Sequence, residues 1–137
     1  MALDTAARAL LHFAMAAGLG PWTNLLFLGP AGPLGRRLAS LSSPSPAGNT
    51  YHFAVAPDAR MWLADQQGAL ADIYARLLPG GHFIFGLNPS HTAPDLTPWK
   101  ALDDLRHAGF SDYAAYLYGS EELGYPGRQN ILFKAIR

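Results

Sequence analysis

The apolar residues between positions 69 and 85 change their spacing once, and this change predicts a helix followed by a strand. Apolar side chains first recur at three- and four-residue steps, as on one face of a helix: Leu70, Ile73, Tyr74, Leu77 and Leu78. The Pro-Gly-Gly sequence at 79–81 cannot continue a helix and allows a sharp reversal of the chain. Residues 82–85 are then aromatic and aliphatic, as in a buried strand. We expect a helix over about residues 60–78, a tight turn and a strand.

Four further segments precede this unit. The Ala- and Leu-rich residues 2–17 predict an amphipathic helix. The short apolar run at 24–28 is typical of a parallel strand that is covered on both faces. A glycine-rich turn leads from it into a predicted helix over 33–41. The β-rich segment 50–56, which Pro57 ends, is the next predicted strand.

The last third of the chain predicts one helix and two strands. Thr97 is a suitable helix cap with proline after it, and the helix is expected to end at Gly109. The tyrosine-rich segment 113–118 and the apolar segment 129–136 predict strands. Because a loop joins these two strands directly, we expect them to pair antiparallel.

Length and composition limit the kind of protein. At 137 residues the chain is expected to form one domain, with residues 1–20 as an N-terminal helical extension. Ten basic residues balance ten acidic ones, so no basic surface for nucleic acid or anionic membrane is expected. No apolar run is long enough to span a bilayer. The absence of cysteine excludes disulfides and thiolate metal sites and suggests a cytoplasmic protein, and the five scattered histidines do not indicate a metal site.

Two short sequence segments resemble segments of the class I S-adenosylmethionine-dependent methyltransferases. These are the Leu-Leu-Pro-Gly-Gly turn at 77–81 with its aromatic strand, and the Gly-Phe pair at 109–110. The resemblance implies that 50–56 is the fourth strand of that family's Rossmann-like sheet. Between Leu28 and Thr50 there is room for one helix and a loop, whereas two further strand-helix units need roughly 30 residues each. We therefore predict an α/β fold with a reduced sheet of about five strands, mostly parallel with a C-terminal antiparallel hairpin and flanked by helices.

The same resemblance implies where S-adenosylmethionine would bind. In the family, an acidic residue lies two positions before the first of several alternating glycines. Here Phe27 stands at the acidic position, and of the later glycines only Gly32 is present, one position out of step. The candidate cofactor-binding residues are Gly29, Gly32 and Asp58, the last as a substitute for the acidic residue of the missing second strand. The alternative is an ordinary turn from strand to helix, with Asp58 capping the next helix.

The polar loop after the strand at 82–85 carries the candidate catalytic residues, Asn88 and His91. An asparagine carbonyl can orient an amine or hydroxyl, and a histidine can accept its proton. The alternative is structural, because Asn-Pro is also an ordinary turn dipeptide.

Loss of the second strand would turn the apolar segment 24–28 into a sheet edge, which natural proteins rarely leave bare. Either the helix at 2–17 covers this edge, or a second copy or another protein pairs with it. Our hypothesis is a methyltransferase-like pseudo-enzyme that acts as an association or accessory subunit, as a homo-oligomer or with a protein partner. The alternatives are an active S-adenosylmethionine-dependent methyltransferase of a small molecule, or one part of a split enzyme.

Overall fold

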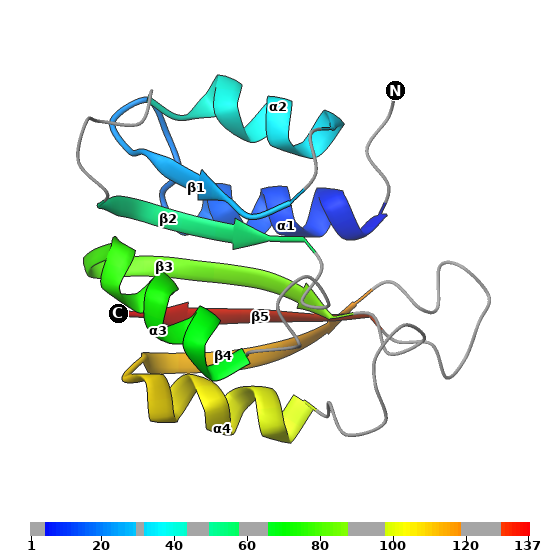
Figure 1. Ribbon diagram of the computed structural model, residues 1–137. Helices are drawn as coiled ribbons and strands as arrows, with labels where there is room; N and C mark the ends of the chain where they lie inside the picture. Colours follow the sequence, from blue (N-terminus) through cyan, green and yellow to red (C-terminus); the bar gives the residue numbers. More distant parts are fainter. Residues whose placement is uncertain (1–4, 30–31, 44–49, 58–65, 88–97, 119–129) are drawn as a thin grey trace.

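The computed structural model describes residues 5–29, 32–43, 50–57, 66–87, 98–118 and 130–137. Helices and strands alternate along most of the chain and form one sheet with helices on both faces (Figure 1). The elements in chain order are α1 (Thr5–Ala16), β1 (Leu25–Phe27), α2 (Pro33–Leu41), β2 (Tyr51–Ala56), α3 (Gln66–Arg76), β3 (Leu77–Leu87), α4 (Pro98–Ala108), β4 (Ser111–Tyr118) and β5 (Asn130–Ile136).

The sheet has five strands in the order β1-β2-β3-β5-β4. β1, β2 and β3 are parallel, whereas β5 runs antiparallel to both β3 and β4. Since β1 is an edge strand with no further strand beyond it, the described part of the chain has no strand equivalent to the second and third strands of the family. The predictions of a shortened, mostly parallel sheet and of a C-terminal antiparallel hairpin are confirmed. β1 and β4 are the two edges of the described sheet.

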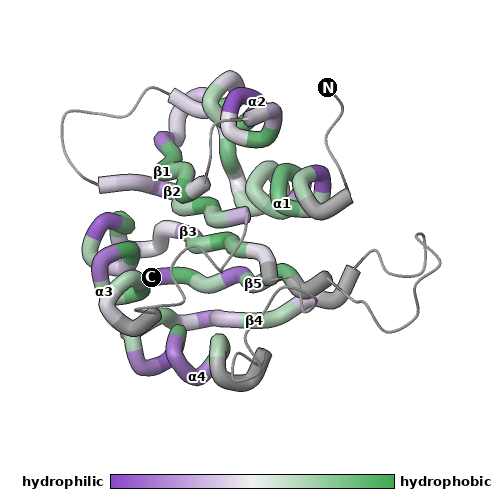
Figure 2. Tube along the Cα trace, turned by 45° about the vertical axis from the view of Figure 1, so that its right-hand side comes forward, coloured by the Kyte–Doolittle hydropathy of each residue, from purple (hydrophilic) through white to green (hydrophobic). Residues whose placement is uncertain are grey.

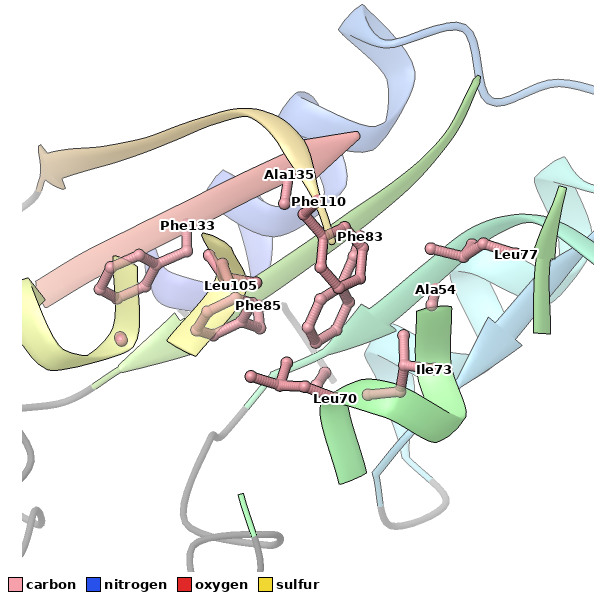
Figure 3. Close-up of a cluster of buried hydrophobic side chains, with 12 residues drawn as sticks. Ala54, Leu70, Ile73, Leu77, Phe83, Phe85, Leu105, Phe110, Phe133 and Ala135 are labelled. Atoms are coloured by element: carbon pink, nitrogen blue, oxygen red, sulfur yellow. The ribbon is translucent and has the colours of Figure 1, made fainter. Parts of the chain in front are cut away.

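Each face of the sheet has its own apolar core. On one face, α3 and α4 cover a cluster of aromatic and aliphatic side chains that Figure 3 shows in close-up. In this cluster the Phe85 ring stacks between Phe83 and Phe133, at 4.7 Å from each ring centroid. On the other face, α1 and α2 pack on Leu25, Phe53, Val55, Ile84 and Leu132. Because β2, β3 and β5 contribute to both cores, they form the buried centre of the fold.

The distribution of polar residues agrees with these layers. In Figure 2 the middle strands are largely hydrophobic, whereas hydrophilic residues lie on α2, α3 and α4. No helix among the described residues is both long enough and apolar enough to cross a membrane.

The predicted helix over 60–78 is wrong at its C-terminal end, because α3 stops at Arg76 and Leu77 already belongs to β3. Leu77 pairs with Tyr51 of β2. The Arg137 side chain donates to the carbonyl of Leu77 and to that of Tyr74, the latter at 3.1 Å. These long-range hydrogen bonds stabilise the extended backbone where the apolar spacing alone favours another helical turn. Similarly, β4 begins at Ser111, two residues before the predicted start.

Candidate functional site

The carboxyl ends of β1, β2 and β3 form the edge at which parallel α/β sheets usually bind ligands. Gly29 comes two residues after β1, Pro57 directly follows β2, and Gly86 lies near the end of β3. The N–H of Leu28 donates to the carbonyl of Val55 at 2.8 Å, so the start of the β1–α2 connection is held against β2. The candidate cofactor site is therefore bounded by three strand ends whose backbones lie close together.

Gly29 is closely packed against the protein's own rings. A Cβ atom at this position would lie 2.9 Å from Cγ of Pro57 and 3.1 Å from Cε2 of Phe27. The same Phe27 atom lies 3.1 Å from the Cβ position of Gly35, in the first turn of α2. Phe27 thus fills the space between the loop and the helix. The small size of Gly29 is needed for internal packing.

Gly32 is the residue before the first turn of α2 and carries no comparable constraint. Its φ of 179° and ψ of −173° are extended backbone that any residue adopts. Its carbonyl accepts the N–H of Arg36 at 3.1 Å, as expected at the start of a helix. Pro33 follows and has no N–H to offer. The local geometry therefore does not distinguish Gly32 as a ligand contact.

The sequence analysis missed Gly86, the third member of this junction. A Cβ atom there would lie 2.7 Å from the carbonyl oxygen of Pro57, so β3 approaches the end of β2 more closely than a side chain would permit. The pairing of the two strands brings these residues together, and nothing in the local sequence marks Gly86. Its role is to allow close contact between the strand ends.

Three of the predicted site residues, Asp58, Asn88 and His91, lie outside the described residues. Asp58 follows Pro57 in sequence, and Asn88 follows Leu87, the last residue of β3. Of the predicted set, the structure therefore places only Gly29 and Gly32, which flank the connection between β1 and α2.

The described residues of this edge do not fit the cofactor that the fold family implies. Residues 27–29, 55–57 and 85–87 contain no aspartate or glutamate that could accept hydrogen bonds from ribose hydroxyls. Phe27 lies where the family has its acidic residue, and rings occupy the Cβ side of Gly29. Among the described residues there is also no group of three histidine, cysteine, aspartate or glutamate side chains that could hold a metal ion.

A cavity of about 460 Å³ lies at the opposite end of the strands. It is lined by residues of the α1–β1 connection and of the first parts of β2 and β3, including Thr23, His52, Gly80 and His82. The sequence analysis gave the two histidines no role. Phe53 pairs with His82 in the parallel strands β2 and β3, so His52 and His82 lie one position apart in the register. A prediction of this register would have brought the two histidines together.

His82 is a neutral side chain in this cavity. Its ring stacks on Phe53 with a centroid distance of 5.3 Å, and its Nδ1 atom is buried without a hydrogen-bond partner among the described residues. Burial, and secondarily the positive charge of Lys134, lowers the pKa of His82 below the ordinary value of 6.5. The imidazole is therefore uncharged at neutral pH and can offer the cavity a hydrogen bond but no fixed charge.

Asn24 holds His52, one of the residues that line this cavity. Its Oδ1 accepts the backbone N–H of His52 at 2.8 Å, and its Nδ2 donates to the carbonyl of Thr50 at 2.9 Å. The His52 Nδ1 atom lies 2.7 Å from the same Oδ1. The amide therefore extends the pairing of β1 and β2 beyond the end of their ladder. We assign Asn24 a structural role.

Solved structures with the same architecture are S-adenosylmethionine-dependent methyltransferases. One from Archaeoglobus fulgidus is 10% identical, with a TM-score of 0.69 over 98% of this chain and 95% of that chain. One from Mesorhizobium loti is 16% identical, with a TM-score of 0.68 over 99% of this chain and 100% of that one. The Burkholderia thailandensis 1,6-didemethyltoxoflavin-N1-methyltransferase, with bound S-adenosylhomocysteine, is 14% identical, with a TM-score of 0.69 over 98% of this chain and 79% of that chain. No protein-family model and no curated protein sequence matches the chain.

Proposed function

We propose that this chain, which has a reduced class I methyltransferase-like fold, is an accessory subunit that acts by association and does not transfer methyl groups. The observation that carries the proposal is the packing at Gly29, where Pro57 and Phe27 occupy the side of the loop that a bound cofactor would need. We also propose that the partner is a second copy or another protein, that neither nucleic acid nor membrane is involved, and that the protein acts in the cytoplasm.

Two features together disfavour cofactor binding. Binding over Gly29 would require the backbone to approach the ligand closely, yet the Phe27 ring already lies within van der Waals reach of the Cβ positions of both Gly29 and Gly35. The acidic residue that holds the ribose in the family is expected on its second strand, which the described sheet does not contain. A cofactor would have to displace a packed ring without gaining a charged hydrogen bond in return.

Isothermal titration calorimetry with S-adenosylhomocysteine and with S-adenosylmethionine tests the proposal. The expected result is no saturable heat at micromolar ligand. An active methyltransferase titrated with the same ligand stock controls for ligand quality. Binding in the micromolar range would overturn the proposal.

An active methyltransferase of a small molecule is the second candidate function. It is favoured by the fold shared with structures that contain the cofactor or its product, such as the Burkholderia thailandensis enzyme. In this case Asp58 and the loop of Asn88 and His91 would supply the polar groups that the described strand ends lack. The cofactor would bring the reactive methyl group, and the protein would align the acceptor and exclude water. Transfer of a labelled methyl group to a small-molecule acceptor would establish this function.

A split enzyme is the third candidate. It is favoured by the open edge of β1, because the second strand of the family would pair there. Another polypeptide could then provide both the missing strand and its acidic residue. Co-purification of a defined second chain from the native source, together with cofactor binding by the complex but not by the isolated chain, would support this function.

A further inference from the structure

The outer edge of β1 presents unpaired backbone groups. The carbonyl of Asn24 accepts a hydrogen bond from β2 at 3.2 Å, and the N–H of Leu28 donates one to β2 at 2.8 Å. Since alternate residues of a strand direct their N–H and C=O groups to the same side, Leu25 and Phe27 direct theirs away from β2. Within the part of the chain that the structure describes, no hydrogen bond is made to these groups.

The other described elements of the fold leave this short edge open. The carbonyl of Thr23, just before β1, is already bonded to Ser43, by its N–H at 2.7 Å and its hydroxyl at 3.1 Å. α1 does not cover the edge, because it packs on the face of the sheet against β3 and β5 (Figure 1). The expectation that the helix at 2–17 covers β1 is therefore not met by its described residues, which leaves the other expectation, pairing with a strand of a second copy or of another protein.

The two edges of the sheet differ in how they are protected. In β4 the register shifts between Ser111 and Ala114, and Asp112 has a φ of 47°. A bulge and a charged residue of this kind discourage pairing with another strand. β1 consists of Leu25, Leu26 and Phe27 and has no charge, proline or register shift. An incoming strand is therefore expected at β1.

We infer that β1 pairs antiparallel with β1 of a second copy, about a two-fold axis through Leu26. In this register Leu26 faces the partner's Leu26, and Leu25 faces the partner's Phe27. Each copy contributes an N–H and a C=O from both Leu25 and Phe27, so the eight groups form four hydrogen bonds. The inference names a second copy of the chain as the partner in the proposed association function, and it rests on that function.

A second copy is the expected partner of this edge, because two copies related by a two-fold axis form a closed dimer. A two-fold contact uses the same surface on both copies, whereas β1 against β4 of another copy would leave free edges and propagate into filaments. No like charges would face each other across the new pair, because the strand is uncharged. The Leu26 side chain is only partly buried against the cluster that α3 and α4 cover, and the partner strand would cover more of it. Trp22, 88% exposed three residues before β1, offers further apolar surface to the partner.

A cysteine crosslink tests the register directly, because the chain contains no cysteine of its own. Residues that face each other in a non-hydrogen-bonded antiparallel pair have Cα atoms about 4.5 Å apart, which a disulfide can span. Under mild oxidation Leu26→Cys is expected to run mostly as a disulfide-linked dimer on a non-reducing gel. The matched control Ala115→Cys, an exposed position on the opposite edge strand, is expected to remain largely uncrosslinked.

Size-exclusion chromatography with light scattering provides the second readout. The wild-type chain is expected to move from monomer to dimer with rising concentration, Leu26→Lys to stay monomeric, and Ala115→Lys to behave as the wild type. A wild-type monomer at all concentrations, together with no crosslink at position 26, would overturn the inference, as would crosslinking through Ala115→Cys alone. Cofactor binding by a two-fold dimer would refute the proposed function but leave the pairing intact.

Discussion

Replacing Gly29 with alanine would place a methyl group where the protein's own rings already lie. The new Cβ would be 2.9 Å from Cγ and 3.1 Å from Cδ of Pro57, and 3.1 Å from Cε2 of Phe27. A proline ring cannot rotate away as a long side chain can, and the Phe27 ring is packed against the α1 and α2 core. The substitution is therefore expected to destabilise the free protein, without any ligand.

The size of the effect follows from overpacking of a folded core. Forcing an extra carbon into a tightly packed position costs about 1–3 kcal/mol in free energy of unfolding. For a chain of 137 residues, an unfolding entropy of about 2.1 cal/mol/K per residue means that 1 kcal/mol lowers Tm by about 3–4 °C. We expect Gly29→Ala to lower Tm by about 4–10 °C.

Chemical and thermal denaturation followed by circular dichroism would measure this loss. Gly20→Ala is the matched control, because the nearest atom to its Cβ position is 3.9 Å away and its effect should stay within about 0.5 kcal/mol. Pro57→Ala in the Gly29→Ala background should recover part of the loss, with a coupling energy of about 0.5–3 kcal/mol. A Gly29→Ala protein as stable as the wild type would show that internal packing does not require glycine at position 29. It would favour the alternative that Gly29 leaves room for a bound ligand.

Two further substitutions test the opposite end of the sheet. Asn24→Ala should lower the free energy of unfolding by about 1–3 kcal/mol in urea titrations, because Asn24 is 4% exposed and its loss would leave the His52 N–H and the Thr50 carbonyl without their partner. An unchanged free energy of unfolding would contradict the structural role of Asn24. The lowered pKa of His82 means that the unfolded chain binds the proton more readily, so wild-type stability should fall as pH drops below 6.5. His82→Phe should lose less stability over the same pH range, and equal losses in both proteins would contradict the assignment.

Much of the fold could be predicted because the spacing of apolar residues within a short segment indicates whether that segment forms a helix or a strand. The helix expected at 33–41 has the same bounds as α2, since Pro33 begins it and polar serines follow it. The strand at 50–56 and the final strand agree with β2 and β5 to within one residue. The shortened sheet with its C-terminal antiparallel hairpin followed from the family resemblance together with the small number of residues between Leu28 and Thr50.

The errors and omissions arose where distant residues decide the outcome. The end of α3 depends on Arg137, which is 60 residues beyond Leu77 in sequence and binds its carbonyl. The role of Gly29 depends on Pro57, which the sequence analysis treated only as the end of a strand. The cavity beside His82 exists because the α1–β1 connection and the first residues of β2 and β3 meet at one end of the sheet. Local patterns contain none of these contacts.

The position of β5 between β3 and β4 has a consequence for the order in which the protein can fold. Its seven residues, Asn130–Ile136, follow the other described strands in sequence and leave the ribosome after them, yet they occupy an interior place in the sheet. Until they emerge, β3 and β4 have no common partner, and the aromatic layer around Phe85 lacks Phe133. Cooperative folding should therefore begin only after nearly the whole domain has been synthesised, so that nascent chains stalled before residue 130 stay sensitive to protease whereas longer ones become resistant.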